Sequence, residues 1–332
     1  MTSGLTSQAI VFEKPGELVL RTVTLAPAGA ADLVVDIEAT GISTGTEKLL
    51  WDGTMPVFPG LSYPLVPGYE AVGVVRQAGE QCLLASGERV FVPGASCYEE
   101  GVRGLFGASA STLVVPEARV TPIAQLPSEQ ATLLALASTA MHILTCRIRQ
   151  DVTNKPLHIS DVKAHTPQLI VGHGVLGRLL ARICIAVGAD APLVWELDSQ
   201  RREAGVGYDV ISPDDDTGTS RQHIVDVSGA CGDHFNHLIK HLGKGGRLTL
   251  GGFYNDAVNF NFAPAFMREI SLDIAAEWTP DDLSLTLGLV QAGILSLDGL
   301  VSHQHAFSRA KDAYPMAFND PACLKMILNW SA

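Results

Sequence analysis

The sequence predicts an α/β protein of two domains, a mostly antiparallel, barrel-like β domain and a doubly wound parallel-sheet domain. Short β-rich segments separated by glycine and proline fill residues 8–125. From residue 168 onward, strand-like and helix-like segments alternate, which is typical of a parallel sheet with helices on both faces. The chain has 332 residues, which is enough for two hydrophobic cores.

The expected elements follow from these two patterns. In the first region, strands are expected at 9–12, 33–37, 71–75, 89–92 and 112–115, followed by a helix at 128–149. In the second, strands are expected at 168–172, 192–197, 222–228 and 246–252, with helices at 177–188, 199–205 and 233–242. The last part predicts a strand at 270–275, a helix at 280–293, a short segment at 300–307, a helix at 308–319 and a strand at 323–328. We expect residues 1–145 and 265–332 to form the first domain and residues 146–264 the second.

Composition narrows the classes of function. Hydrophobic residues make up 47% and charged residues 17% of the chain, which indicates a folded protein. The net charge of −12 disfavours nucleic acid and anionic membrane surfaces as partners. We expect no transmembrane segment and no signal peptide. The six cysteines are scattered without a C-x-x-C pair, so a reducing, cytoplasmic location is expected, with disulfides or a metal lobe as the alternative.

A G-x-G-x-x-G loop follows the strand expected at 168–172. Gly172 would allow the tight turn, Gly174 would let the backbone approach a pyrophosphate, and Gly177 would let the helix pack closely on the strand. The N–H groups at the start of the new helix, from Val175 and Leu176 on, would then bind the diphosphate. The alternative is a group of glycines that serves packing alone.

Glu196 ends the next expected strand, about 20 residues past the loop, where an acid can hold both hydroxyls of a ribose. It predicts NAD rather than NADP as the cofactor, because its carboxylate would repel a 2′-phosphate. Arg201 and Arg202 weaken this argument, unless they cap or solvate the next helix. The residues expected to line the nicotinamide stand at the ends of two later strands, where ordinary turn chemistry is the alternative. They are Ser228, Gly251, Gly252 and Phe253.

Several segments resemble motifs of the medium-chain dehydrogenase/reductase superfamily, and the resemblance covers nearly the whole chain. The segments are GISTGTE at 41–47, PGYEAVG at 67–73, GERV at 87–90, STA at 138–140 and the loop at Gly172. The resemblance implies a GroES-like catalytic domain and a Rossmann dinucleotide-binding domain. It also implies a homodimer, with the late strand and turn near 265–305 as the contact.

The zinc alcohol dehydrogenases of that superfamily hold their metal with a Cys, a His and a third residue in the connecting helix. Here the Cys position holds Ser43 or Thr44, the His position holds Tyr69, and the third position falls near Ala135. Catalytic zinc needs three N, S or O ligands and one open position. Only Glu70 remains of these motifs, so the resemblance implies catalysis without zinc, and the four-cysteine structural zinc lobe is also missing.

Residues 42–73, 253–254 and 325–330 resemble one branch of the superfamily, the 3-hydroxyethyl bacteriochlorophyllide a dehydrogenases. This resemblance implies NAD-dependent oxidation of the C3 1-hydroxyethyl group of a magnesium tetrapyrrole to a 3-acetyl group, in bacteriochlorophyll synthesis. Two alternatives stay open. One is a zinc-free enone or quinone reductase of the same superfamily, and the other is a non-catalytic dinucleotide-binding protein.

Without zinc, the hydroxyl proton must leave through a hydrogen-bonded relay. Thr46 holds the position whose hydroxyl bonds the substrate oxygen in the zinc relatives, with a loop-capping threonine as the alternative. Tyr69 replaces a ligand histidine, so its phenol is expected to face the substrate, with local packing as the alternative.

A chlorin ring is flat, broad and apolar, so its cleft needs aromatic and aliphatic walls. Trp51, Phe58 and Tyr63 lie in a loop-rich stretch that would form such a wall, with ordinary core packing as the alternative. His142 lies on the connecting helix near this substrate region. It is expected either to be a satisfied buried histidine or to act as a base or magnesium ligand.

Overall fold

The structure is a computed structural model that describes residues 4–56, 59–99, 101–151, 157–202 and 205–331. The chain divides into two compact units, which we treat separately. The first unit consists of residues 1–135 and 298–332, and the second of residues 136–297. The expected combination of an antiparallel β domain and a doubly wound parallel-sheet domain is confirmed.

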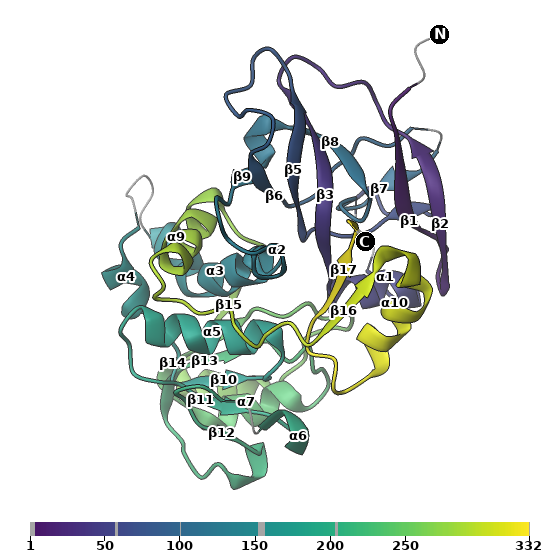
Figure 1. The fold of residues 1–332 in the computed structure, drawn as a ribbon. Coiled ribbons are helices and arrows are strands. Elements are labelled where there is room, and N and C mark those ends of the chain that lie inside the picture. The colour runs from purple at the N-terminus through teal and green to yellow at the C-terminus, as the bar shows by residue number, and fades with distance from the viewer. Residues whose placement is uncertain (1–3, 57–58, 100, 152–156, 203–204, 332) are drawn as a thin grey trace. The chain divides into compact units, whose positions relative to one another are not determined.

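The first unit is built on two sheets. The larger has the order β16-β17-β3-β5-β6-β9, with β8 also paired to β3. Its strands are β3 (Asp32–Ile42), β5 (Ala71–Ala78), β6 (Arg89–Val92), β8 (Thr112–Pro116), β9 (Thr121–Pro122), β16 (His303–Ala306) and β17 (Met326–Asn329). Figure 1 shows purple β3 beside yellow β17, and the two pair antiparallel, so both ends of the chain build one sheet.

The smaller sheet has the order β2-β1-β4-β7. Its strands are β1 (Thr6–Lys14), β2 (Glu17–Thr24), β4 (Leu65–Val66) and β7 (Arg103–Gly104). The helices of this unit are α1 (Thr46–Asp52), α2 (Ser128–Ala131) and α10 (Ala310–Asn319). The sequence pattern missed β2 and α1, because β2 alternates only weakly and α1 lies in a stretch rich in glycine and threonine.

The second unit has a six-stranded parallel sheet in the order β12-β11-β10-β13-β14-β15, which is the Rossmann order 3-2-1-4-5-6. Its strands are β10 (Leu169–Val171), β11 (Leu193–Trp195), β12 (Val210–Ile211), β13 (Arg221–Asp226), β14 (Leu242–Leu250) and β15 (Ser271–Ile274). Its helices are α3 (Leu134–Asp151, which starts at the unit boundary), α4 (Ile159–Lys163), α5 (Val175–Ala186), α6 (Ser199–Arg202), α7 (His234–His241), α8 (Phe262–Arg268) and α9 (Pro280–Gln291).

The boundary between the units differs from the one expected at residue 265. β15 pairs with β14 in parallel register from Arg247 and Ser271 to Leu250 and Ile274, so the segment expected to return to the first domain adds an edge strand to the parallel sheet. The second unit then runs on through α9 to Leu297. A strand signal at 270–275 does not say which sheet the strand joins, because that choice depends on long-range pairing.

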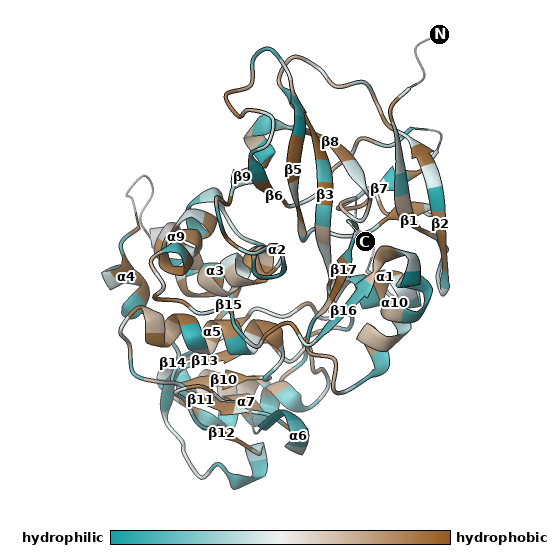
Figure 2. Cartoon of the chain, in the orientation of Figure 1, coloured by the Kyte–Doolittle hydropathy of each residue, from teal (hydrophilic) through white to brown (hydrophobic). Residues whose placement is uncertain are grey.

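Hydropathy differs between the strands and the helices of the second unit. In Figure 2, β10 and β11 are coloured as hydrophobic and α6 as hydrophilic. By length and composition alone, the stretch Ser128–Ile148 is long and apolar enough to cross a membrane, although no transmembrane segment was expected. However, 78% of its most apolar 18-residue window is buried inside the protein, which is the behaviour of a core helix.

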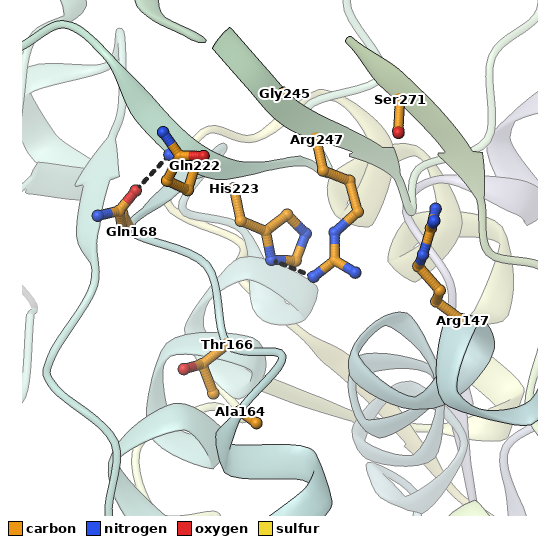
Figure 3. A pocket seen from close by; sticks show the side chains of 9 residues that line it. All are labelled: Arg147, Ala164, Thr166, Gln168, Gln222, His223, Gly245, Arg247 and Ser271. Carbon is orange, nitrogen blue, oxygen red and sulfur yellow. Dashed lines mark hydrogen bonds between the residues drawn. The ribbon is translucent and has the colours of Figure 1, made fainter. Parts of the chain in front are cut away.

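A cavity of about 460 Å³ opens at the amino edge of the parallel sheet (Figure 3). It lies where β13, β14 and β15 begin, whereas the glycine loop leaves the opposite, carboxyl edge of the sheet. It is lined by Arg147, Ala164, Thr166, Gln168, Gln222, His223, Gly245, Arg247 and Ser271.

Candidate active site and dinucleotide-binding edge

The glycine loop has the geometry expected of a dinucleotide-binding turn. Gly172 has a φ of +104°, and a Cβ there would lie 3.0 Å from the Cα of Ser228. A Cβ on Gly177 would lie 1.9 Å from the Gly172 carbonyl oxygen, so only glycine allows this close packing of helix on loop. A Cβ on Gly174 would meet no atom within 4 Å, which leaves the backbone there open to a ligand.

Helix α5 begins directly after this opening, with Gly174 as its N-cap and Val175 and Leu176 as its first residues. The first N–H groups of a helix have no intrahelical acceptor and carry the positive end of the helix dipole. A diphosphate therefore fits this loop, which the open backbone at Gly174 leaves accessible.

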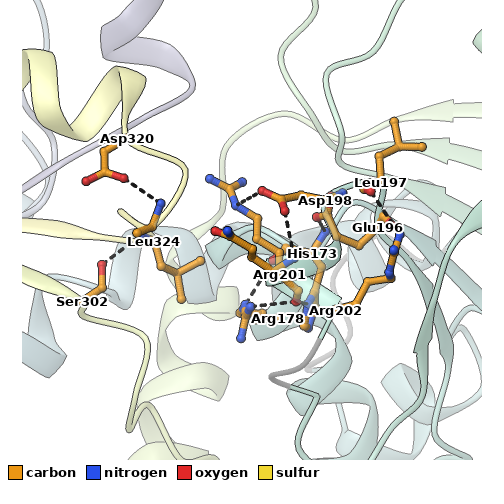
Figure 4. Close-up of polar contacts among 12 residues, drawn as sticks. His173, Arg178, Glu196, Leu197, Asp198, Arg201, Arg202, Ser302, Asp320 and Leu324 are labelled. Carbon is orange, nitrogen blue, oxygen red and sulfur yellow. Dashed lines mark hydrogen bonds and ion pairs between the residues drawn. The ribbon is translucent and has the colours of Figure 1, made fainter.

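The Glu196 carboxylate lies directly against the glycine loop (Figure 4). Its Oε2 accepts the N–H of His173 at 3.0 Å, and its Oε1 accepts the N–H of Asp198 at 3.0 Å. Arg202 donates to the carbonyl oxygens of Glu196 and Leu197, both at 3.0 Å. These contacts hold Arg202 on the backbone that precedes α6.

His173 contributes its backbone to the loop and buries its ring. The ring nitrogens contact the Arg201 carbonyl oxygen at 2.7 Å and the Tyr208 hydroxyl at 2.9 Å. Burial lowers the pKa of His173 to about 4, so the imidazole is neutral near pH 7. Arg178 donates to the His173 carbonyl oxygen at 3.0 Å, and this hydrogen bond holds the backbone of the loop in place.

A buried carboxylate that sequence reasoning missed organises the neighbouring strand end. Asp226 ends β13 with no exposed surface, and it accepts the N–H and the hydroxyl of Ser228 at 2.9 and 2.7 Å. It also accepts the Tyr254 hydroxyl at 3.0 Å and contacts His234 Nε2 at 3.1 Å. Burial, followed by the nearby Asp226 charge, raises the pKa of Tyr254 above its usual range. An aspartate at the end of a strand, just before Ser-Gly, was the signal that could have identified it.

The remaining residues expected at the nicotinamide lie at the end of β14. A Cβ on Gly251 would lie 2.4 Å from Ile143 of α3, so this glycine permits a close helix contact. A Cβ on Gly252 would lie 3.4 Å from the backbone nitrogen of Gly229, in the segment that follows β13. Phe253 is 46% exposed. The structure thus brings Ser228 and Gly252 into one edge with the Gly172 loop.

In the first unit, Tyr69 at the His position of the zinc relatives contacts Ser43, one of the two candidates for their Cys position. Tyr69 donates its hydroxyl to Ser43 Oγ at 2.6 Å, and its ring packs edge-on against Phe106 with centroids 5.2 Å apart. Burial raises the pKa of Tyr69 above its usual range, and the nearby Glu70 adds to the rise. Hydrogen bonding to the Ser43 and Thr46 side chains opposes it, so Thr46, the first residue of α1, belongs to the same cluster.

Two fully buried carboxyl groups lie next to this cluster. Glu47 accepts the N–H of Ser43 at 3.1 Å and the hydroxyl of Tyr314 at 3.0 Å. Burial raises the pKa of Glu47 to about 8, and the charge of Glu70 adds to the rise. Glu70 forms an ion pair with Lys325 of the C-terminal segment, and both side chains are buried. The Glu70 carboxylate thus has a lysine as its buried partner.

Two of the three aromatic residues expected to form a substrate wall, Trp51 and Tyr63, have contacts within the first unit. Trp51 packs edge-on against Phe12 with ring centroids 5.5 Å apart, and Tyr63 donates its hydroxyl to the Leu50 carbonyl oxygen. These contacts match the core-packing alternative. Phe58 lies outside the described residues.

His142 lies on α3, in the second unit. Its Nδ1 contacts Asp282 Oδ2 at 2.8 Å, while Thr145 donates to Oδ1 of the same carboxylate at 2.6 Å. Hydrogen bonds from these side chains and Thr279 outweigh burial and hold the pKa of Asp282 below its usual range. This is the satisfied-histidine alternative.

Comparison with known proteins agrees with this geometry. The model of the alcohol dehydrogenase GroES-like domain matches residues 29–125. The 2-desacetyl-2-hydroxyethyl bacteriochlorophyllide A dehydrogenase of Rhodobacter capsulatus is 47% identical over 324 residues, and that of Cereibacter sphaeroides is 45% identical over 328 residues. Each match covers 98% of this chain and 98% of the relative.

Solved structures of alcohol dehydrogenases share the fold. The 2R,3R-butanediol dehydrogenase of Bacillus subtilis aligns with a TM-score of 0.79 at 16% identity, over 97% of this chain and 99% of that chain. The acetophenone reductase of Geotrichum candidum, solved with NAD, aligns with a TM-score of 0.79 at 16% identity, over 99% and 98%. A Sinorhizobium meliloti dehydrogenase solved with NADP aligns with a TM-score of 0.74 at 18% identity, over 98% and 99%.

The near full-length matches extend the resemblance from single motifs to the whole chain, and those relatives are dehydrogenases that act on an alcohol group. The chain is therefore an oxidoreductase acting on CH–OH groups, and it belongs to the medium-chain dehydrogenase/reductase superfamily, in the family of the 2-desacetyl-2-hydroxyethyl bacteriochlorophyllide A dehydrogenases.

Proposed function

We propose that this protein oxidises the C3 1-hydroxyethyl group of a magnesium (bacterio)chlorophyllide a to a 3-acetyl group in bacteriochlorophyll synthesis, with NAD as hydride acceptor and without catalytic zinc. The observation that carries the proposal is the hydrogen bond from Tyr69 to Ser43, in a chain whose Gly172 loop suits a dinucleotide. It supports a site in which hydroxyl groups, rather than a zinc ion, bind the substrate oxygen and take part in removing its proton.

The choice of NAD rests on Glu196. The Glu196 carboxylate accepts the N–H of His173 in the glycine loop. This contact supports a position of the carboxylate beside the ribose of a bound dinucleotide. The free 2′- and 3′-hydroxyls of NAD would donate to it, whereas a 2′-phosphate would be repelled. Bound NAD supplies the acceptor for the hydride that leaves the carbinol carbon. Gly172, Gly174 and Gly177, with the N–H groups of Val175 and Leu176, would hold its diphosphate.

The hydroxyl proton is the second product that must leave. We propose that Thr46 and Tyr69 hydrogen-bond the substrate oxygen and carry its proton away as the carbonyl forms. The raised pKa of Tyr69 keeps its phenol protonated near pH 7. Tyr69 therefore accepts the substrate proton only while it donates its own hydroxyl proton to the next group. Ser43 accepts the hydrogen bond of the Tyr69 hydroxyl at 2.6 Å, so it is the next hydroxyl in the relay, and the proton that it passes on must finally be released to solvent water.

Zinc independence follows from the chemistry of the side chains at the ligand positions. Ser43, Tyr69 and Ala135 offer two neutral hydroxyls and a methyl group, whereas zinc requires thiolate, imidazole or carboxylate ligands. Among the described residues, no group of three His, Cys, Asp or Glu side chains is arranged to hold a metal ion. We propose that the stretch that contains Trp51, Phe58 and Tyr63 borders the pigment.

We also propose a homodimer and a cytoplasmic location. β15 ends the parallel sheet, and Leu272 and Ile274 on it are exposed, as are Phe262, Phe266 and Met267 of α8. A second copy that pairs this edge across a two-fold axis would cover the exposed apolar side chains. All six cysteines are free, which suits a reducing compartment.

The test is a turnover assay with purified, chelator-treated protein, NAD and a 3-hydroxyethyl chlorophyllide, followed by pigment absorbance and NADH formation. Product with a 3-acetyl group and one NADH per turnover is the expected result. Reduction of enones with NADPH, and no oxidation of the pigment, would instead identify the reductase alternative. Tight NAD binding without turnover on any hydroxyethyl chlorin would identify the non-catalytic alternative. Activity that returns only with added zinc would contradict the metal-free mechanism.

A further inference from the structure

The cavity at the amino edge of the parallel sheet has no part in the proposed oxidation. It opens where β13, β14 and β15 begin, and the glycine loop lies at the other end of the same strands. Its volume of about 460 Å³ is within the range of small-molecule sites. Its walls carry two guanidinium groups, two carboxamides and two hydroxyls, beside the apolar surface of residues such as Ala164.

The two lining arginines share one carboxylate, Asp273 next to the cavity, so this group of three side chains carries one excess positive charge. Arg147 donates to Asp273 Oδ1 at 3.1 Å, and Arg247 Nε lies 3.9 Å from Asp273 Oδ2. A single carboxylate thus serves two guanidinium groups. Burial, together with the nearby Arg147 charge, lowers the pKa of Arg247, and Asp273 opposes the shift. The two arginines therefore repel each other across a partly dehydrated space, and the carboxylate only half balances them.

His223 orients Arg247 without adding charge. Its Nδ1 accepts from Arg247 Nη2 at 2.9 Å, and its Nε2 contacts the Thr249 hydroxyl at 3.0 Å. Burial lowers the pKa of His223 to about 3, so the imidazole is neutral and acts as an acceptor toward Arg247. Arg247 Nη2 also donates to the His165 carbonyl oxygen at 3.4 Å, which adds a second anchor on the same nitrogen.

The remaining guanidinium donors are available to a ligand. Figure 3 shows the Arg247 side chain between His223 and Arg147, with Ser271 above it on β15. Within the described part of the chain, neither Arg147 Nη2 nor Arg247 Nη1 has a hydrogen-bond partner. Guanidinium groups held in this way match the planar fork of a carboxylate.

We propose that this cavity binds a small monocarboxylate, whose carboxylate is held by Arg147 and Arg247 and whose remaining atoms lie beside the side chains of Gln168, Gln222 and Thr166. A monovalent carboxylate balances the single excess charge. A phosphate dianion would leave one negative charge uncompensated beside Asp273, so the site favours carboxylates over phosphate. The proposal is independent of the oxidation reaction, and the class of ligand suggests an effector site.

The test is calorimetric titration of the full-length protein with sodium propionate at constant ionic strength, with inorganic phosphate and chloride as comparison anions. We expect saturable one-site binding of propionate with a Kd on the order of 1–10 mM, and weaker binding of phosphate. Arg147→Gln and Arg247→Gln should each weaken propionate binding by about tenfold, the effect of losing one charge-assisted hydrogen bond. Arg147 is 39% exposed, so its variant keeps the test usable if Arg247→Gln does not fold.

Asp273→Asn separates a ligand site from a structural ion-pair cluster. Removing the competing carboxylate raises the excess charge to two, so a ligand site should bind propionate more tightly. Lys311→Gln, at an exposed position of α10 in the other unit, removes one positive charge as Arg147→Gln does, so it is the control for the arginine variants and should leave binding unchanged. Propionate binding that is absent, that is equal in the Arg147→Gln and Lys311→Gln variants, or that is exceeded by phosphate would overturn the proposal.

Discussion

Tyr69 donates a 2.6 Å hydrogen bond to Ser43, so the residue at the His position of the zinc relatives binds one of the two candidates for their Cys position. Burial raises the pKa of the Tyr69 phenol above its usual range. The hydroxyl–hydroxyl bond joins these two segments directly, which fits the zinc-free site that we propose. It is also part of the proton path that we propose.

Removing either hydroxyl should slow the chemical step. Tyr69→Phe and Thr46→Val keep nearly the same shape, and we expect at least one of them to lower kcat by about 10²–10⁴-fold, the usual size of acid–base assistance. The Kd for NAD should not change, because the glycine loop is untouched. Tyr98→Phe removes a hydroxyl that donates to the Gly107 carbonyl oxygen and serves as the control. If the double variant turns over at the native rate, the proton leaves by another route.

The cofactor preference should depend on Glu196. Replacing Glu196 by Ala removes the carboxylate that would accept from the ribose and repel a 2′-phosphate. We therefore expect the ratio of kcat/KM for NAD to that for NADP to fall by at least about tenfold, as one charge-assisted interaction is lost. Asp198→Asn, which changes a neighbouring acid, should keep the native ratio. Native protein that binds NADP more tightly than NAD would contradict this interpretation of Glu196.

Stability should depend on pH through Glu47. Its pKa is raised from 4.5 to about 8 by burial and by the nearby Glu70, while Lys325 opposes the rise. The folded state therefore binds a proton that the unfolded state has lost. The contribution of Glu47 to stability is present below pH 4.5 and decreases as the pH rises toward 8.

Urea unfolding at several pH values measures this effect. The difference in unfolding free energy between the native protein and Glu47→Gln should fall by up to about 1.4 kcal/mol per pH unit between pH 5 and 8, and then level off. Glutamine stays neutral and still accepts the Ser43 N–H, so it isolates the titration. A difference that does not change with pH would show that Glu47 does not titrate in this range.

Asp226 should be needed both for stability and for cofactor binding. Asp226→Asn replaces one acceptor oxygen by an amide N–H2 group, among donors from Ser228, His234 and Tyr254. The amide N–H2 group then faces one of these donors and cannot accept its hydrogen bond. We expect a loss of about 1–3 kcal/mol in unfolding free energy and weaker NADH binding by fluorescence. Tyr254→Phe removes only one of the donors and should have a smaller effect on both. Native NADH affinity in a folded Asp226→Asn variant would separate Asp226 from the cofactor site.

The edge of the parallel sheet should decide the oligomeric state. Ile274→Lys on β15 places a charge on a 70% exposed apolar position, and we expect it to convert the proposed dimer to a monomer in sedimentation velocity. Leu83→Lys, at an exposed apolar position of the first unit, is the matched control and should sediment as the native protein does. Native protein that sediments only as a monomer at micromolar concentration would exclude the dimer.

The sequence by itself determined the dinucleotide-binding edge, because the features that build it are local. The turn at Gly172, the start of α5 and the acid after β11 lie within about 30 residues of one another, and glycine and strand patterns at that range predict their geometry. The fold class could be predicted for the same reason, since strand–helix alternation is visible along the chain.

Only the tertiary structure decided which partner each buried polar group has. Ser43 with Tyr69, Glu47 with Tyr314 and Glu70 with Lys325 join segments that are far apart in the sequence. No local pattern predicts such pairs, because they form when strands from both ends of the chain pack into one sheet and each buried polar group must find a partner. Long-range pairing also placed β15 in the parallel sheet, where its strand pattern alone could not assign it.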